Sequence, residues 1–461
     1  MMEIKKYLFA TALTGILVGA ITAEATIKIS DGSTQLIEEE ISPTKFSDMT
    51  PKSDNDPTGV NIKFNAFAHF QAGYRRQGNL TPEEKAASSY KNNLAFFDEA
   101  AIVAQISNKI ESGLEYGAKI VIVPTAKRKA SNAYNGTHVF ISSEYGKLEL
   151  GAPISPSSTM MISSSDITAG TNKWDRYANI SSKYQQQNDL NPSFVTASEF
   201  FMSDKYTTKL DNRSYSSEPS RAIVYYTPKF NLGNKTKFTI GLAYTPDSSN
   251  TGAENIDKAG TSIEIKKIGG TSGIDRFEFD LSVKDAVAAG ITIEQNLSDG
   301  LDLKIGITGE MGKSQGTAKK FTNAADTIPV SEHKLANLKA YNIGAVLNYG
   351  NFSYAASYGS LGKSLTTPEY HKTGRKTDYY TAAIAYNQGP FKVSANYFKS
   401  NKFKNTAEAW TLATDYTAAP GLKPYLELTR YRLNGRPEFY GDLAKKKVSG
   451  TVLIGGFKLA I

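Results

Sequence analysis

Short segments in which every second residue is apolar follow one another along most of this chain. The first begins VNIKF and places Val60 and Phe64 on one face and Lys63 on the other. The same pattern returns in LDLKIGITGE, residues 301–310, and in PFKVSANYF, residues 390–398. Successive side chains of a β-strand point to opposite faces, so this period of two predicts strands with one apolar and one polar face. The chain is therefore expected to be an all-β protein.

The segments are joined by connections that are alternately short and long. Seven short ones are rich in the Gly, Asn, Asp and Pro that tight turns require, and they lie near residues 108, 144, 231, 296, 349, 387 and 418. Eight long ones lie near residues 77–94, 124–136, 153–220, 246–273, 313–337, 362–377, 400–407 and 434–446. Seven short and eight long connections join sixteen strands, which is the number predicted here.

One of the expected strands is unusually long. The strands should cover residues 60–76, 95–107, 112–123, 137–143, 147–152, 221–230, 236–245, 275–296, 301–312, 338–348, 351–360, 378–387, 390–399, 407–417, 421–433 and 447–461. In the stretch 275–296 the odd positions from Phe277 to Ile293 stay apolar almost throughout. We interpret it as one tall strand, with an extra hairpin near Asp285 as the alternative.

The alternation does not by itself say which face meets which solvent. In a soluble sandwich the apolar face packs inward, whereas in a transmembrane barrel it meets lipid and the polar face lines the lumen. An even number of strands with short turns at one end and long loops at the other is typical of outer-membrane barrels. The apolar segments also have the roughly 9–11 residues that a tilted strand needs to cross the hydrocarbon layer. Tyrosines stand at many ends of the apolar faces, as in aromatic girdles: Tyr74, Tyr244, Tyr349, Tyr358, Tyr386, Tyr397 and Tyr416.

The prediction is therefore a transmembrane, antiparallel, up-and-down β-barrel of sixteen strands. The chain ends on an apolar alternation, TVLIGGFKLAI, and an unpaired terminal strand of this kind is a template for aggregation. Pairing the last strand, 447–461, with the first, 60–76, closes the barrel and removes both edges. A soluble, secreted β protein is the weaker alternative.

The first 25 residues have the organisation of a cleaved secretory signal peptide. A basic start precedes an apolar stretch from Tyr7 to Ala23, and Ala25 completes a small-x-small cleavage pattern. A membrane anchor is the alternative, although the stretch is shorter than the ~20 residues of a spanning helix. Residues 26–57 are polar and are expected to form a periplasmic extension, either solvated or acting as a helix or tether. Residues 58–461 should form the barrel.

Composition and motifs point away from several classes of function. Lys and Arg number 53 against 45 Asp and Glu, and the charges are dispersed without a basic stripe, so no nucleic-acid partner is expected. The chain has no cysteine, and its four histidines lack the spacing of metal ligands. GSLGKS and MGKSQG lack the first glycine of a phosphate loop. We therefore expect no cofactor, no metal and no enzymatic activity, with a surface adhesin or an outer-membrane enzyme as the alternative.

Three segments resemble the general porins of Gram-negative outer membranes. They are EYGKLELGAP, residues 144–153, YYTPKFNLGNKTKFTIGLAYTPD, residues 225–247, and the terminal strand. Ala152 stands where the family usually has Arg, and Ile461 replaces the usual final Phe. The resemblance implies a homotrimer of sixteen-stranded barrels in outer-membrane lipid, each with its third loop folded into the lumen. It also implies passive passage of small hydrophilic solutes and ions.

The connection 153–220 is the candidate functional segment. It has nearly 70 residues, far more than an ordinary connection, so we expect it to fold into the lumen, mainly through its first half, and to set the width of the opening. Trp174 and Tyr177 are available to pack it against the wall. Its acids would face bases on the lumen side of the strands, creating a transverse field at the narrowest point. The constriction candidates are Asp166, Asp175, Asp189, Lys63, Arg75, Lys119 and Lys147. For any one of them, simple solvation in a wide vestibule is the alternative.

Overall fold

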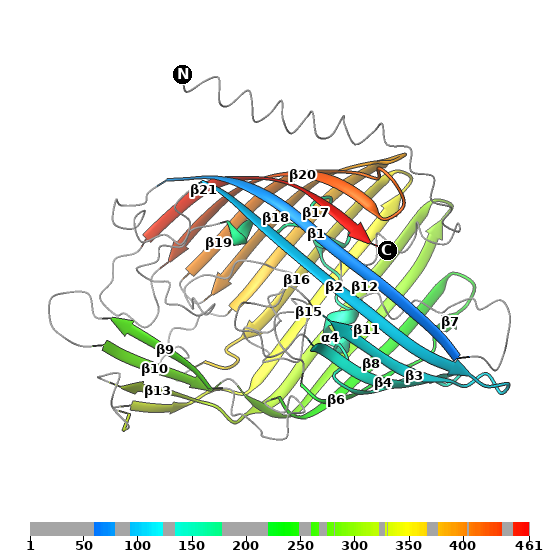
Figure 1. Ribbon diagram of the computed structural model, residues 1–461, viewed down its shortest axis with the longest axis horizontal. Coiled ribbons are helices and arrows are strands. Elements are labelled where there is room, and N and C mark those ends of the chain that lie inside the picture. The colour runs from blue at the N-terminus through cyan, green and yellow to red at the C-terminus, as the bar shows by residue number, and fades with distance from the viewer. Residues whose placement is uncertain are drawn as a thin grey trace, which may run out of the picture.

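The protein is a closed, antiparallel β-barrel of sixteen strands, seen in Figure 1 with the chain running around the wall from β1 in blue to β21 in red. The computed structural model describes residues 60–78, 93–122, 134–177, 220–248, 260–266, 274–280, 282–321, 328–329, 331–366, 377–402, 405–435 and 446–460. The predicted signal peptide and the polar extension, residues 1–57, lie outside these ranges. Among the described residues, no helix is long and apolar enough to cross a membrane.

The barrel strands follow one another in chain order. They are β1 (Val60–Gly78), β2 (Leu94–Lys109), β3 (Glu115–Ile122), β4 (Tyr134–Ser143), β5 (Gly146–Gly151), β6 (Ala222–Tyr226), β7 (Phe230–Leu232), β8 (Thr236–Asp247), β11 (Val283–Ser298), β12 (Leu301–Ser314), β15 (Leu338–Tyr349), β16 (Phe352–Gly362), β17 (Thr377–Gln388), β18 (Phe391–Lys402), β19 (Asn405–Tyr416), β20 (Leu422–Gly435) and β21 (Lys446–Ala460). The short β6 and β7 both pair with β8 and together make one barrel strand, which gives sixteen.

The barrel closes where the sequence predicted that it would. β21 pairs with β1 from Phe67 opposite Ala460 to Gly78 opposite Ser449. The terminal strand therefore has neighbours on both sides, β20 and β1, and neither end of the sheet is an open edge.

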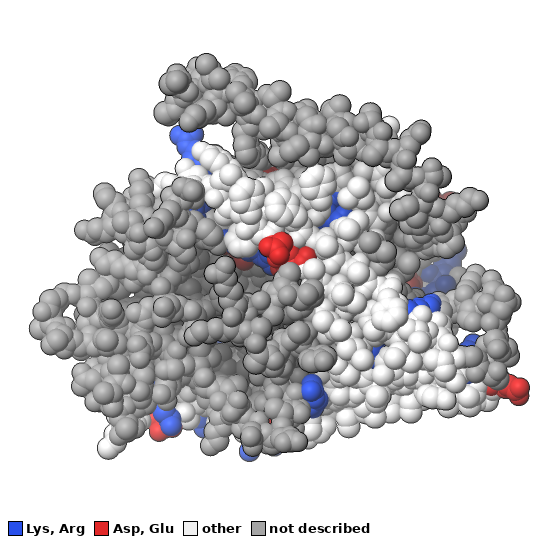
Figure 2. Space-filling model, viewed as in Figure 1, with Lys and Arg blue, Asp and Glu red and all other residues white. Residues whose placement is uncertain are grey.

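The two faces of the wall are those that the alternation predicted. On β1, Val60, Ile62 and Phe64 point outward with exposed fractions of 66%, 55% and 70%, whereas the inward His69 and Gln71 are buried. Figure 2 shows this outer wall as a largely uncharged surface over β1 and β2, with a few separate acidic and basic spots. An exposed apolar band around a closed barrel is the surface that a bilayer solvates.

Aromatic pairs mark both ends of this outer band. Phe352 lies against Tyr386, with ring centroids 4.8 Å apart, at the end that carries the short turns. At the other end, Tyr397 lies 4.4 Å from Trp410. Such girdles are typical of the two membrane interfaces, because these rings have an apolar body and, in Tyr and Trp, a polar tip.

A second, four-stranded sheet stands apart from the barrel wall, at the lower left of Figure 1. It contains β9 (Gly260–Lys266), β10 (Ile274–Asp280), β13 (Thr317–Phe321) and β14 (Ser331–Lys334), in the order β14-β13-β10-β9. All but β10 come from connections predicted as loops. Their sequences are short, and short segments give a weak signal of period two.

This second sheet corrects the prediction of one tall strand over 275–296. β10 ends at Asp280 and pairs with β9 and β13, whereas β11 starts at Val283 and pairs with β8 and β12. The hairpin proposed near Asp285 is also absent from the described residues. Asp285 instead has a φ of +49° beside a register shift between Lys284 and Val287. Alternation is a local property, so it continued through two consecutive strands that belong to different sheets.

Candidate functional site

The segment that follows β5 lies inside the barrel. We call residues 152–177 the inner loop; it contains α4 (Pro156–Thr159), η3 (Ser164–Asp166) and η4 (Trp174–Arg176). α4 contacts β8, β11 and β12, and η3 contacts β16 and β17. The inner loop thus follows the wall rather than crossing the lumen directly. The remainder of the predicted constriction segment, 178–219, lies outside the described residues.

A track of glycines lets the inner loop lie close against the wall. Inward-facing glycines occupy successive strands at Gly241 on β8, Gly290 on β11, Gly306 on β12 and Gly344 on β15. A Cβ atom on Gly290 would lie 2.9 Å from Cβ of Met160, and one on Gly306 would lie 2.6 Å from the Met160 carbonyl oxygen. At Gly344 it would meet the carbonyl of Ile162. Real Cβ atoms do not approach so closely, so these positions need glycine while the loop stays there.

The glycine track was visible in the sequence but was not recognised. Gly241 is in register with Gly290, and Gly306 with Gly344, so the glycines are neighbours across the sheet. A glycine inside a strand often marks the close approach of another backbone. Because glycine recurs on the polar face of four consecutive strands, the sequence could have been used to predict the path of the inner loop along the wall.

Two aromatic side chains anchor the end of the inner loop, as the sequence analysis expected. Trp174 stacks on Tyr431 of β20 with ring centroids 5.0 Å apart and an interplanar angle of 21°. Tyr177 meets Phe97 of β2 edge-on at 5.1 Å and covers Gly73 of β1. Both anchors are almost fully buried. The loop is thereby fixed to strands from both ends of the sheet, close to the seam where the barrel closes.

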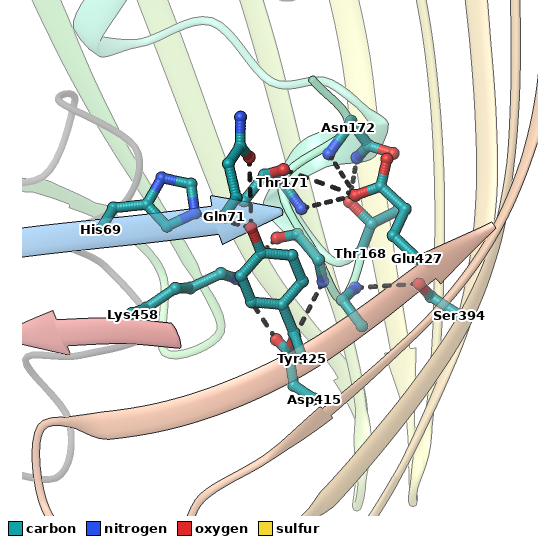
Figure 3. Close-up of polar contacts among 12 residues, drawn as sticks. His69, Gln71, Thr168, Thr171, Asn172, Ser394, Asp415, Tyr425, Glu427 and Lys458 are labelled. Atoms are coloured by element: carbon teal, nitrogen blue, oxygen red, sulfur yellow. Dashed lines mark hydrogen bonds and ion pairs between the residues drawn. The ribbon is translucent and has the colours of Figure 1, made fainter. Parts of the chain in front are cut away.

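A wall carboxylate binds the main chain of the inner loop (Figure 3). Glu427 on β20 accepts hydrogen bonds at Oε2 from the backbone nitrogens of Thr171 and Asn172, each 2.9 Å long. Gly170 and Asn172 have φ values of +72° and +53°, and such alternation of backbone conformation turns successive N–H groups towards one point. Glu427 therefore fills an anion-binding turn of the loop.

Charged groups around Gly170 hold the same turn from the other side. The Gly170 nitrogen donates to Oδ1 of Asp415 at 2.8 Å, and Nζ of Lys458 donates to the Gly170 carbonyl at 2.6 Å. Lys458 lies 5.3 Å above the ring of Tyr425, whose hydroxyl is 2.7 Å from Nε2 of His69. These contacts join β1, β19, β20 and β21 to one backbone turn.

Basic side chains of the inner loop pair with an acid of the wall. Lys173 Nζ lies 2.8 Å from Oε2 of Glu99 on β2, and Arg176 donates to the other oxygen of the same carboxylate. Near α4, the Ser157 hydroxyl donates to Glu310 of β12. In these contacts the wall supplies the acids, whereas the sequence analysis placed the acids on the loop and the bases on the wall.

The predicted loop acids make other contacts. Asp166 accepts a 2.9 Å hydrogen bond from the nitrogen of Ser163 and caps η3. Asp175 is half-buried in η4, and Asp189 lies outside the described residues. The Ser-x-x-Asp pattern of a capping box was the sequence signal for the role of Asp166.

Three of the predicted wall bases lie on β1, β3 and β5, and the fourth binds the loop. Lys63 is in register with Gln105, and Gln105 with Lys119, so these three lie in one row. Lys147 lies on β5, with Nζ 2.7 Å from Oε1 of Glu149.

The fourth base, Arg75, donates from Nη1 to the Tyr177 carbonyl at 2.9 Å. His138, one of the four histidines without the spacing of metal ligands, lies 3.8 Å from the same Glu149 oxygen that Lys147 approaches. The structure therefore brings the bases of β3 and β5 to one part of the inner wall.

Comparison with known proteins supports a single family. A family model described as Gram-negative porin matches residues 62–436. Uncharacterized proteins of Rickettsia felis and Rickettsia bellii are each 40% identical to this chain, covering 89% and 91% of it and 94% and 97% of their own lengths. A solved anion-selective porin from Comamonas acidovorans is 13% identical with a TM-score of 0.49, over 87% of this chain and all of that one. The closed barrel and the family match agree: the chain belongs to the Gram-negative porin family, whose members are channels of the outer membrane.

Proposed function

We propose that this protein is an outer-membrane porin that lets small hydrophilic solutes and ions diffuse passively through a water-filled lumen. The observation that carries the proposal is the closed sixteen-stranded barrel whose inner loop is fixed along the wall by Glu427, Trp174 and Tyr177. A barrel of this size is wide enough for an aqueous channel when its interior is not filled across. A loop held against the wall narrows such a channel without closing it.

We propose that segment 153–220 sets the size limit for solutes. The row of Lys63 and Lys119, together with Lys147, belongs to the wall of β1 to β5 and would face the passage, whereas Arg75 also holds the end of the inner loop. Asp175 and Asp189 remain the candidates for the opposite charge. Asp166 contributes to the fold of the loop through its cap.

The same proposal includes export and assembly. Residues 1–25 would be removed as a signal peptide, and 26–57 would remain in the periplasm. Three copies would assemble as a homotrimer. The outward faces of β1 and β2 support close contact between copies, because they carry small residues in register, such as Ala68 opposite Ala100.

Conductance in planar lipid bilayers tests the channel directly. The folded protein should produce ohmic current steps, and a trimer should produce them in groups of near-equal size. The control for detergent artefacts is the same protein preparation, unfolded before it is diluted into the bilayer chamber, which should produce no current steps. Folded protein that never conducts would contradict the proposal.

A deletion tests the role of the loop. Removing residues 160–200 should raise the single-channel conductance and admit larger sugars in a liposome-swelling assay. Heat-modifiable migration on gels should show first that the deleted protein still forms a barrel. Unchanged conductance and size limit in such a barrel would place the constriction elsewhere.

Surface adhesion is a second candidate, favoured by the separate sheet of β9, β10, β13 and β14. A barrel that binds host cells through this sheet and conducts no ions would support adhesion instead of diffusion.

A further inference from the structure

Basic side chains gather on the outward face of one sector of the barrel, at the rim where the long connections begin. The strands involved, β18 to β21 and β1, lie side by side across the top of Figure 1. Exposed cations point outward from each of them except β19, and we call this set the outer basic patch: Arg76, Lys399, Arg430, Arg432 and Lys447. Its outward direction follows from the alternation, since Leu426 and Leu428 on the same face of β20 are exposed while Thr429 and Tyr431 are buried.

The register of the strands makes this patch contiguous. Arg76 and Arg430 both pair with Thr451 of β21, so they flank one position across the sheet. One row higher, Lys399 and Arg432 both pair with Glu408 of β19. Neighbouring strands are about 4.8 Å apart, and the two cations of a row flank one strand, so their backbones are about 10 Å apart. The long Arg and Lys side chains can reach a common phosphate across that distance.

The outer basic patch lies at the edge of the apolar band. Trp410 is in register with Arg430, is 59% exposed and contacts Tyr397. Further towards the middle of the band, Leu412 and Leu428 are exposed on the same outward face. Tyr and Trp at the end of such a band mark the depth of the lipid head groups.

The charges of this patch are not balanced within the described part of the chain. None of the five cations forms an ion pair with a described residue. The carboxylate in their midst, Glu408, accepts a hydrogen bond from the Tyr397 hydroxyl at 3.2 Å. On the opposite sector, by contrast, the outward Lys313 is 3.2 Å from Asp285. Guanidinium groups that pair with no described acid, placed beside lipid, are favourable sites for counter-charge such as a lipid phosphate.

We propose that the outer basic patch binds the phosphate groups of anionic membrane lipids in the leaflet next to the long connections. The planar guanidinium groups of Arg76, Arg430 and Arg432 can each bind phosphate oxygens in bidentate fashion, and Trp410 covers the upper part of an acyl chain. A zwitterionic headgroup offers less, because its own cation competes for the phosphate. The patch is therefore a lipid-selective site on the outside of the barrel, separate from the passage through its lumen.

Spin-labelled lipids test this selectivity. The protein is reconstituted in phosphatidylcholine with a trace of spin-labelled phosphatidylglycerol or phosphatidylcholine, and electron paramagnetic resonance measures the motionally restricted fraction. The wild type should restrict phosphatidylglycerol preferentially, by about fivefold for each cation that contributes. The triple variant Arg76→Gln/Arg430→Gln/Arg432→Gln should lose most of the preference, and so should the wild type in high salt.

A double variant on the opposite sector is the matched control. Lys313→Gln/Lys339→Gln also removes outward positive charge near the same rim, so it should retain the preference. Equal loss in this control, or no preference in the wild type, would overturn the proposal.

A second copy of the chain is the competing occupant, because Asp98 is an exposed acid on the outward face of β2. A fall in oligomer mass in both the triple variant and Asp98→Asn, with lipid selectivity unchanged, would show that the patch binds protein instead. Single-channel conductance should stay the same in the triple variant. If the barrel selects anionic lipid but conducts no ions, the proposed channel function is wrong while the proposed lipid site stands.

Discussion

Glu427 on β20 accepts a 2.9 Å hydrogen bond from the backbone nitrogen of Asn172, so the barrel wall holds the inner loop by its main chain. A main-chain contact depends on the shape of the turn and only weakly on which side chains the loop carries. The loop is consequently positioned by residues of the strands, and substitutions in the wall should disturb it as much as substitutions in the loop.

Replacing Glu427 with Gln should loosen this turn. The amide removes the charge that strengthens the bonds to Thr171 and Asn172, and we expect a loss of about 1–3 kcal/mol in the free energy of unfolding. Denaturant unfolding monitored by gel migration measures it, with noisier single-channel currents as a second readout. Glu408→Gln, on the outward face, should change the free energy of unfolding by less than about 0.5 kcal/mol. Equal effects would show that the turn is held in another way.

A larger side chain on the glycine track should displace the inner loop. In Gly290→Leu, the new side chain would occupy the space of Met160, so the loop must move into the lumen and the single-channel conductance should change. Gly309→Ala is the control, since its Cβ would meet only the Ala340 carbonyl oxygen at 3.4 Å. A Gly290→Leu barrel with wild-type conductance would mean that the loop does not limit current.

A charge on the lipid face should destabilise the barrel more than the same charge on the lumen face. Ile307 is 45% exposed on the outside of β12, and Ile307→Arg should cost about 2–4 kcal/mol near the middle of the bilayer. Thr239→Arg, on the inward face of β8, should be milder because water can solvate the new cation. Unfolding in lipid vesicles compares the two, and a reversed order would mean that the faces are wrongly assigned.

Charge reversal on the wall that carries Lys63 and Lys119 should change ion selectivity. In Lys63→Glu/Lys119→Glu the two acids would attract cations into the passage, so the reversal potential across a salt gradient should shift towards cation preference. The outward Lys339→Glu should leave it unchanged, since that charge lies outside the lumen. If both variants behave alike, this wall does not border the narrowest part of the channel.

Much of this architecture is determined by local sequence. The period of two identifies the barrel strands and their faces because it needs only the pleat of each strand, as Val60 to Phe64 illustrate. The alternation of short and long connections gives the number of strands, since each turn and loop is encoded where it occurs. Closure follows because a terminal apolar strand needs a partner, and β1 supplies it.

The tertiary structure alone decided which groups meet. Nothing near Phe277 in the sequence says that β10 pairs with β9 instead of continuing into β11. Likewise, Glu427 and Asn172 are 255 positions apart, and only the path of the inner loop around the wall makes the acid a ligand for its backbone. The sequence analysis assigned acids to the loop and bases to the wall from residue types, whereas the folded chain uses wall acids to satisfy loop N–H groups. The alternation of apolar and polar residues is set by neighbours along the chain. Which side chain binds which backbone group depends instead on long-range geometry, because a buried polar group bonds with whichever partner the fold brings to it.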